Sequence, residues 1–280
     1  MLGMHIGKCN DKEMLQSRIQ KQIPERLSHY TTKEALMSIL SDEGGKGICL
    51  WAFSNRHKND DQEIKMGEYM LKRVREALPT KTSLLHQLSG YENTASVSFM
   101  EGDVNQHMLD VYGFYRLEFD LRQLGIGIFT GGLVDCEYVA ESEMKEYADE
   151  YCEMISSTFQ SISTLQTKYG KMSAPPINNL IDFLMMEQDI IAKVFCLKEL
   201  KWRDEHEWRR VFELKPNDTN IHYLNGKPYV ECYLDKSLLT GVTVFCTSET
   251  LDKAKEEVND IYSYISKRGY KADVRFEIYK

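Results

Sequence analysis

The sequence predicts an α+β fold, and three observations lead to that class. Segments with the two-residue period of strands alternate irregularly with segments that have the 3.6-residue period of helices. The chain has 280 residues, 42% of them hydrophobic, so it can bury a substantial core. No internal repeat, low-complexity tract or sharp shift in composition divides it. We therefore predict a single domain over residues 1–280, with a helical insertion at about 141–197.

The first elements alternate between strand and helix. We expect a short strand over Arg26–Thr31. Thr32 then begins a helix that runs to Leu40, because a threonine hydroxyl can accept a hydrogen bond from the first helical turn. The expected elements that follow are a buried strand over Ile48–Phe53, a polar turn over 54–61 and an amphipathic helix that ends near Leu78.

The middle of the chain adds three strands and then becomes helical. Strand-like patterns mark Ala95–Met100, Phe114–Asp120 and Leu133–Val139. An acidic helix over Ser142–Tyr169 and an apolar helix over Ile177–Leu197 follow, separated by a proline pair through which neither helix can continue. These two helices form the predicted insertion.

The C-terminal third returns to strands. Residues alternate as in strands over Trp208–Leu214, Tyr229–Leu234 and Gly241–Cys246. A charged amphipathic helix is expected over Leu251–Arg268, and a last strand over Ala272–Tyr279. The predicted order therefore ends with strand, helix and strand.

Charge and cysteine content exclude several classes of protein. The formal net charge of 35 − 43 = −8 argues against a broadly basic surface that coats nucleic acid or anionic lipid. The seven cysteines include no Cys-x-x-Cys pair, which excludes zinc ribbons and thioredoxin-like redox motifs. No stretch approaches 18 consecutive apolar residues, and the first residues lack the pattern of a secretory signal. We therefore expect a cytoplasmic protein with reduced thiols and no membrane contact.

Several common catalytic motifs are absent from the sequence. It contains no phosphate-binding P-loop and no Gly-x-Ser-x-Gly, and its glycines do not fit Gly-x-Gly-x-x-Gly. His206-Glu207 could open a zinc-protease motif, but the second histidine that the motif requires is Arg210. The motifs of kinases, α/β-hydrolases, Rossmann folds and zinc metalloproteases are therefore missing, and we predict no metal site.

Three segments remain that together contain the residue types expected of a catalytic site. The first is Leu27–Thr31, on a strand that leads directly into a helix. The second is Ser96–Phe99, followed by Met108–Gly113. The third is Trp202–Arg209, which contains two glutamates two positions apart.

These segments resemble the motifs of a bacterial domain-of-unknown-function family whose members look like divergent ADP-ribosyltransferases. The similarity runs from about residue 26 to the C-terminus. Two positions depart from the family, whose Asp-Pro and Met-Trp are Asp60-Asp61 and Met108-Leu109 here. The resemblance implies a mixed or antiparallel split sheet with flanking helices, and an enzyme that uses NAD⁺ as its substrate. The motifs that carry it are His29-Tyr30-Thr31, Asn59-Asp60, Ser98-Phe99, Met108-x-x-x-Tyr112 and Trp202-x-x-Glu205-x-Glu207-Trp208-Arg209.

The two glutamates suit the reaction that the resemblance implies. Cleavage of the nicotinamide–ribose bond leaves an oxocarbenium-like sugar, which a carboxylate stabilises. By resemblance, Glu207 grips the nicotinamide ribose and steadies this cation, and Glu205 orients or deprotonates the acceptor. If the segment is extended, both side chains point to one face of the sheet.

The resemblance also assigns the residues that bind NAD⁺. His29 is expected to hydrogen-bond the other ribose, and the backbone of its neighbour to hold the nicotinamide amide. Tyr30 or Tyr112 would offer a stacking face. Arg209 or Lys198 would face the pyrophosphate. Thr31 and Ser98 complete the expected NAD⁺-binding set.

The acceptor and the reaction class stay open at this point. An ADP-ribosyltransferase of the toxin or phage-defence type would modify protein or single-stranded nucleic acid, RNA included, and would need a neutralising protein partner. The helices of 141–197 offer one docking surface for that partner. An NAD⁺ glycohydrolase uses water as the acceptor, and a non-catalytic nucleotide-binding or partner-binding module would keep the fold alone. A local basic group near the third segment is compatible with a short nucleic-acid strand; it comprises Lys198, Lys201, Arg203, Arg209 and Arg210.

Overall fold

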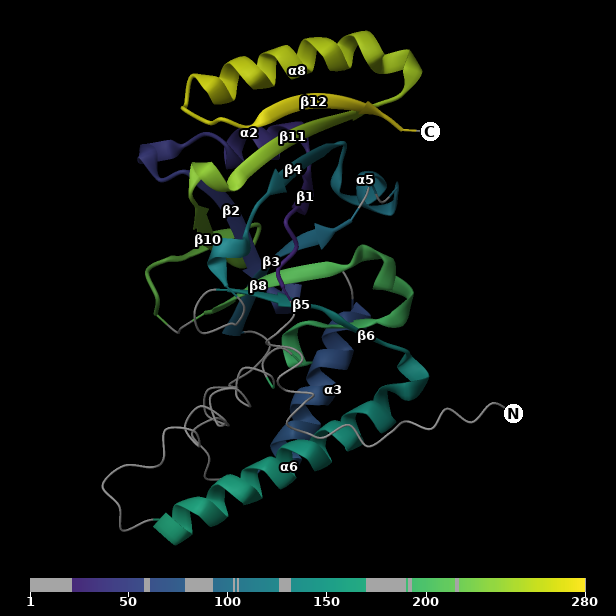
Figure 1. Ribbon diagram of the computed structural model, residues 1–280, viewed down its shortest axis with the longest axis vertical. Coiled ribbons are helices and arrows are strands. Elements are labelled where there is room, and N and C mark those ends of the chain that lie inside the picture. The colour runs from purple at the N-terminus through teal and green to yellow at the C-terminus, as the bar shows by residue number, and fades with distance from the viewer. Residues whose placement is uncertain are drawn as a thin grey trace.

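A large, mostly antiparallel sheet organises the molecule, with helices on its faces and at its ends (Figure 1). The computed structural model describes residues 22–57, 61–78, 93–102, 104, 106–125, 132–169, 190, 193–214 and 217–279. Within these residues the α+β class is confirmed. No helix there has both the length and the apolar composition that crossing a bilayer requires.

Ten strands form the main sheet. Among the described strands of this sheet, β11 and β12 form the one parallel pair. Eight strands lie in the order β12 (Asp273–Ile278), β11 (Leu239–Cys246), β4 (Tyr115–Phe119), β1 (Leu27–Thr31), β3 (Thr94–Glu101), β2 (Ile48–Ser54), β10 (Lys227–Leu234) and β9 (Ile221–Leu224). Strand β8 (Glu207–Glu213) pairs with the other edge of β3 and with β5 (Leu133–Asp135). A separate parallel pair joins β6 (Glu137–Val139) to β7 (Leu197–Glu199).

The sheet divides along one edge of β3. Strand β1 pairs with β3 near its end, at Met100 and Glu101, whereas β2 pairs near its start, at Ala95 and Ser96. In the described registers, residues 97–99 pair on this edge with neither strand. Strands β1 and β2 therefore diverge from β3, and the other edge of β3 is covered by β8.

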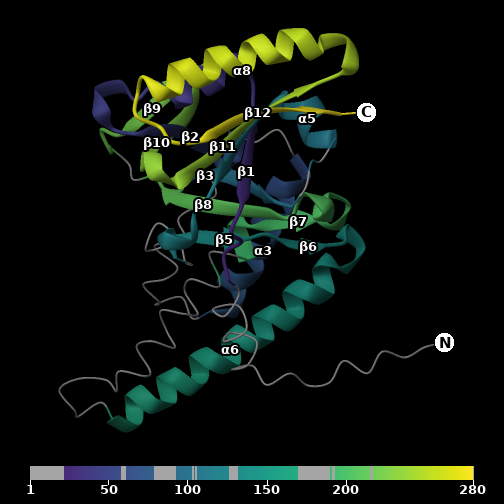
Figure 2. The same cartoon turned by 45° about the horizontal axis from the view of Figure 1, so that its top comes forward.

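Helices lie at both ends of the sheet. They are α2 (Lys33–Ile39), α3 (Asp61–Ala77), α5 (Gln106–Tyr112), α6 (Met144–Tyr169) and α8 (Leu251–Ser266). The Thr32 hydroxyl accepts a hydrogen bond from the Ala35 amide, which confirms it as the N-cap of α2. Helix α8 lies along β11 and β12 at one end of the molecule, and α6 lies at the opposite end (Figures 1 and 2).

The buried apolar side chains form two main clusters. One joins the sheet to α2 and α8 and includes Leu36, Val242 and Ile265. The other joins α3 to α6, where Val74 and Ile155 are both buried, and extends to β5–β8. The long acidic helix therefore packs on α3 through its apolar stripe, as the 3.6-residue period of both helices requires.

Most predicted elements form within one to three residues of their expected bounds. The single strand predicted over Leu133–Val139 is wrong, because the chain changes partner after Cys136: the Cys136 amide still donates to the Glu207 carbonyl of β8, whereas the Glu137 amide donates to the Cys196 carbonyl next to β7. The helix predicted over Ile177–Leu197 lies largely outside the described residues, and its last residue begins β7 instead. The patterns did not predict β9 or the short helix α5.

Candidate functional site

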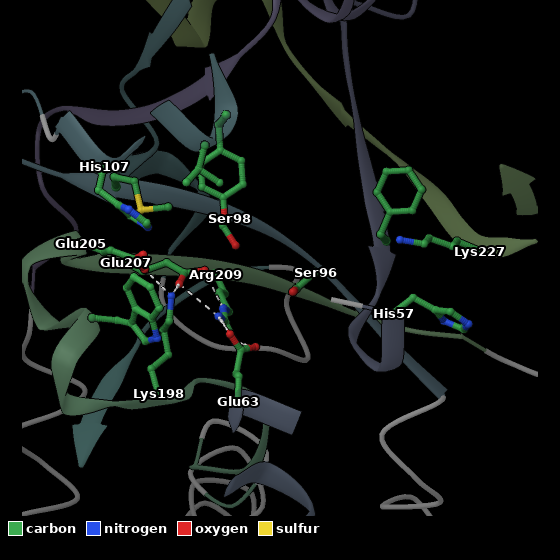
Figure 3. A pocket seen from close by; sticks show the side chains of 15 residues that line it. His57, Glu63, Ser96, Ser98, His107, Lys198, Glu205, Glu207, Arg209 and Lys227 are labelled. Atoms are coloured by element: carbon green, nitrogen blue, oxygen red, sulfur yellow. Dashed lines mark hydrogen bonds and ion pairs between the residues drawn. The ribbon is translucent and has the colours of Figure 1, made fainter. Parts of the chain in front are cut away.

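A cavity of about 600 Å³ opens on the face of the sheet next to β8. Ligand pockets in proteins have volumes of about 300–1,000 Å³. Its lining comes from β2, β3, β8 and β10 of the sheet, and from α3, α5, β7 and the 3₁₀ segments around them. Two of the three segments that the sequence singles out supply lining residues, and the third, Leu27–Thr31, is joined to the lining residue Ser98 through His29. The lining residues that carry charge or a titratable ring are His57, Glu63, His107, Tyr112, Lys198, Glu205, Glu207, Arg209 and Lys227 (Figure 3).

Strand register explains why residues from distant segments meet here. Ser98 of β3 stands opposite Arg209, and Met100 stands opposite Glu207. Side chains alternate between the two faces of a sheet, so residues two apart on β3 and on β8 share the face that carries the cavity. The position of Glu207 and Arg209 on this face follows from their spacing of two.

Arg209 is the central cation of the site and is almost completely buried, at 1% exposure. Its Nε and Nη2 donate to the two oxygens of Glu207 at 2.7 and 3.0 Å. Its Nη1 and Nη2 both donate to Glu63 at 2.8 Å, and Nη1 also donates to the Phe195 carbonyl at 2.7 Å. A guanidinium has five N–H donors, and all five are used. The expectation that Arg209 faces the pyrophosphate is therefore corrected: this side chain holds the two carboxylates.

Lys198, from β7, joins the second glutamate to the same cluster. Its Nζ donates to Glu207 Oε2 at 2.7 Å and also contacts Glu205 Oε2. Burial by itself would lower the pKa of Lys198, but the carboxylates around it outweigh this effect and raise the pKa. Lys198 is therefore a fixed cation between two carboxylates, and its ammonium is directed at them and not at an outer pyrophosphate.

The backbone around the two glutamates is not extended, which corrects one premise of the sequence analysis. Glu205 ends the 3₁₀ segment η6 (Leu200–Glu205), and His206 has a left-handed conformation with φ of 44°. The Glu207 amide donates to the Tyr138 hydroxyl at 2.8 Å and begins β8. The turn at His206 and the shared Lys198 bring the carboxylates together, so they are neighbours for a different reason from the one predicted.

The buried cluster carries an excess of negative charge. Three carboxylates face two cations, so the formal sum is 2 − 3 = −1 when all are ionised; the members are Glu63, Glu205, Glu207, Lys198 and Arg209. Burial, aided by the nearby Glu207, raises the pKa of Glu205 despite the opposing effect of Lys198. A buried ionic cluster contributes little net stability, and perturbed groups beside a cavity are typical of functional sites.

The His29 segment lies beside the cavity, and its side chains are not among the cavity's lining residues. Nδ1 of His29 donates to the Ser98 carbonyl at 3.0 Å, at the position where β1 leaves β3. Tyr30 is buried in a small cluster with Met108 of α5, so its ring offers no open stacking face there. Thr31 is also buried, and its carbonyl lies against Gly113.

Ser98 and Tyr112 both line the cavity, as part of the expected NAD⁺-binding set. Tyr112 ends α5, a short helix that packs on β1 through Met108 and Leu109. Burial and the nearby Glu207 charge raise the pKa of the Tyr112 phenol, so it stays neutral over the physiological range. Of the two tyrosines considered, Tyr112 is the one that lines the cavity.

The structure adds lining residues to which the sequence analysis assigned no role. The Asn59-Asp60 motif lies outside the described residues. Glu63 lies on α3, and its distance from Arg209 in the chain hides their contact. His107 and Trp202 stack at 4.9 Å between ring centroids. Among the described residues, Trp202 Nε1 and His57 Nδ1 are buried without a hydrogen-bond partner. Buried polar atoms without a partner are uncommon in folded proteins.

Comparison with protein-family models, with curated proteins and with solved structures finds no match for this chain. Within the described part of the chain, no group of three or more His, Cys, Asp or Glu side chains is arranged to hold a metal ion. The fold and the cavity therefore define only a class, an α+β protein with an ion-paired carboxylate cluster in a ligand-sized cavity. Chemically, such a cluster can stabilise a developing positive charge and accept a proton.

Proposed function

We propose that this protein is an NAD-dependent ADP-ribosyltransferase that transfers ADP-ribose to a macromolecular acceptor. The observation that carries the proposal is the Glu207 carboxylate, which is 2% exposed and accepts hydrogen bonds from two cations at a cavity wall. These bonds hold a negative charge in a fixed position before a substrate arrives. The family resemblance of the surrounding motifs supplies the identity of the substrate.

The proposed first step breaks the bond between nicotinamide N1 and ribose C1′. Both bonding electrons leave with the nicotinamide, which departs neutral, and C1′ becomes cationic. Glu207 stabilises this cation, since the net charge of the buried cluster is negative and its carboxylate is already desolvated. Arg209 is a positioning residue in this scheme because it holds Glu207, and Glu63 is one because it holds Arg209.

In the proposed second step an acceptor oxygen or nitrogen forms a bond with C1′ and loses a proton to Glu205. The raised pKa of Glu205 makes it a better base than an ordinary carboxylate. Glu205 Oε2 forms an ion pair with Lys198. Lys198 contacts both glutamates, so in this scheme Glu205, the base, lies beside Glu207, which stabilises the cation. Transfer requires the two groups to be close together.

Aromatic side chains around the cavity supply stacking surfaces for the two rings of NAD⁺. Tyr112 lies on α5, and the stacked His107–Trp202 pair forms another part of the lining. Stacking of this kind contributes about 0.5–1.5 kcal/mol per ring pair. The proposal extends, on the resemblance alone, to a toxin or phage-defence role in the cytoplasm and to a neutralising protein partner.

The substitution Glu207→Gln tests the proposal. It keeps the side-chain size and removes the charge, so nicotinamide release and ADP-ribose transfer should fall by about 10²–10³-fold. NAD⁺ affinity should fall less, because the charge matters most in the transition state. Turnover is measured with labelled NAD⁺ and affinity by calorimetry, and thermal unfolding checks the fold. Glu213→Gln, at the exposed end of the same strand, is the matched control. Near-normal turnover in Glu207→Gln would refute the assignment.

The substitution Glu205→Ala separates transfer from hydrolysis. If Glu205 serves the acceptor, transfer to a macromolecule should fall much more than nicotinamide release into water. The ratio of the two rates is the measurement, with label followed after separate protease and ribonuclease treatment. Free ADP-ribose with no labelled macromolecule would identify a glycohydrolase. Absence of NAD⁺ cleavage in the wild-type protein would leave only a binding module.

A further inference from the structure

A row of aromatic side chains lies on the outer strands of the sheet. We define this aromatic row as Trp51, Phe53, Tyr229 and His222, from β2, β10 and β9. Centroids of Trp51 and Tyr229 are 4.7 Å apart with ring planes at 30°, and those of His222 and Tyr229 are 5.4 Å apart at 32°. The ring centroid of Phe53 lies 6.3 Å from that of Trp51 and 5.4 Å from that of Tyr229. The four rings therefore form one continuous array.

The aromatic row lies on the face of the sheet that carries the cavity. Phe53 lines the cavity and stands opposite Ser96 of β3, which also lines it. Tyr229 stands opposite Phe53 on one side and His222 on the other, so the three side chains share that face. Lys227, two residues before Tyr229, also lines the cavity, on the side away from Lys198 and Glu207 (Figure 3).

The row is accessible to a partner. Trp51 is 40% exposed, although an indole of this size is usually well buried in a protein. The next residue of β10 on the same face is Glu231, and the one after it is Tyr233, which the Lys46 ammonium approaches to 5.0 Å. A lysine thus lies on each side of the row, Lys227 before Tyr229 and Lys46 at Tyr233, with the Glu231 carboxylate between them. Flat rings flanked by cations match the chemistry of nucleobases joined by phosphates.

We propose that the aromatic row stacks the bases of a single-stranded nucleic acid and leads that strand into the cavity as the acceptor. The strand must be single, because paired bases expose no faces for stacking. Stacking supplies most of the affinity, since the chain has a formal net charge of −8 and only a few cations lie near the row. The acceptor role rests on the proposed function, whereas binding of the strand does not.

Strand geometry shows that the row and the glutamates are within reach of one short strand. Phe53 on β2 is two strand spacings from β8, about 10 Å. Along β3, the residues opposite Phe53 and Glu207 are Ser96 and Met100, four residues or about 13 Å apart. The resulting diagonal of about 16 Å corresponds to roughly five stacked nucleotides at about 3.4 Å each. An oligonucleotide of about 12 nucleotides therefore covers both.

Fluorescence anisotropy with labelled oligonucleotides tests the binding, in the absence of NAD⁺. The probes are single-stranded RNA, single-stranded DNA and the corresponding duplex, each of about 12 nucleotides. The double substitution Trp51→Ala/Tyr229→Ala should weaken single-strand binding by at least about tenfold, because each stacked base contributes a several-fold or larger factor. Tyr223→Ala is the matched control: Tyr223 lies on β9 next to His222, points to the opposite face and is 70% exposed. It should change the affinity by less than about twofold.

The outcomes separate this proposal from the proposed function. Binding of a single strand that the double variant loses and the control keeps supports the row, and labelling of that strand with ADP-ribose supports its acceptor role. Strand binding without NAD⁺ cleavage would overturn the transferase and leave the binding surface. NAD⁺-dependent labelling of protein alone, unchanged in the double variant, would overturn the acceptor assignment. Absence of strand binding, equal loss in the control, or preference for the duplex would overturn the proposal.

Discussion

Glu205 and Glu207 share one ammonium and differ in what else holds them. Glu207 accepts two further hydrogen bonds from Arg209, whereas burial raises the pKa of Glu205. Two carboxylates in different environments are suited to different roles, one as a fixed charge and one as a base. The proposed division of work between them follows from these contacts.

Replacement of Glu205 should stabilise the protein at neutral pH. A carboxyl whose pKa is raised on folding binds its proton more tightly in the folded state than in the unfolded state. Its contribution to stability is fully present below the unfolded value of 4.5 and is lost as the pH rises through the folded value. Glu205→Gln should therefore unfold at a higher temperature than the wild type at about pH 8, and the difference should disappear toward about pH 4. An equal or lower unfolding temperature at about pH 8 would contradict this, and Glu213→Gln serves as the control.

His29 combines a structural contact with a proposed ligand contact. Burial lowers its pKa, so the ring is neutral, and donation from Nδ1 to the Ser98 carbonyl leaves Nε2 as an acceptor. His29→Ala should lower stability by roughly 0.5–1.5 kcal/mol and weaken NAD⁺ binding. His29→Asn can keep a donor near Nδ1, so it should recover stability without recovering affinity. Calorimetry and thermal unfolding measure the two effects, and unchanged NAD⁺ affinity in both variants would limit His29 to the structural contact.

At the scale of elements, the junction of α5 and β1 positions Tyr112. Gly113 directly follows α5 with φ of 113°, and a Cβ there would lie 2.6 Å from the Thr31 carbonyl oxygen. Only a residue without a side chain allows the backbone to approach this closely. The close approach holds the end of α5 on β1, beside the cavity.

Gly113→Ala should therefore be more destabilising than an equivalent change elsewhere. Gly102 also has a positive φ, of 98°, but a Cβ there would meet nothing within 4 Å. Alanine is strained by the positive φ at both positions, but only at position 113 does its Cβ also clash with a neighbour. We expect this clash to lower the free energy of unfolding by a further ~1–3 kcal/mol. Denaturant unfolding of both variants measures the difference. Equal destabilisation would show that the contact with Thr31 relaxes freely.

At the scale of the whole molecule, the cavity lies where the two apolar clusters meet. Glu63 comes from α3, which packs in the cluster with α6, while Ser98 lies on β3, whose Phe99 belongs to the cluster with α8. The site is complete only when both clusters are folded. This arrangement favours one cooperative unit, as the prediction of a single domain requires.

Two matched core substitutions test that prediction. Ile155 on α6 and Ile265 on α8 are both almost fully buried, in different clusters. Each Ile→Ala change should cost about 2–5 kcal/mol, and in a single domain each should shift the same unfolding transition. Calorimetry is the measurement. Two transitions, each moved by only one of the substitutions, would show two independent domains.

Local patterns were sufficient to predict most elements, for reasons that particular residues show. Thr32 caps α2 through its own hydroxyl, and the apolar stripe of α3 at Met70 and Val74 follows the helical period. Strand β9 was not predicted, because three of its four residues are exposed and carry no alternation. The strand is interrupted at Cys136 because the next amide, that of Glu137, donates to the Cys196 carbonyl, 59 positions away, which no local pattern contains.

The sequence by itself determined the α+β class, the order of most elements and the candidate residues in three separated segments. Only the tertiary structure decided which of these residues meet. In the folded protein Arg209 holds Glu63 and Glu207. Glu205 lies next to Glu207 because both contact Lys198 and because the backbone turns at His206. Tyr30 is buried against α5. The physical reason is that backbone preference and hydrophobic period act over a few residues. The pairing of buried charges depends instead on strand register and on which chain segments leave water together.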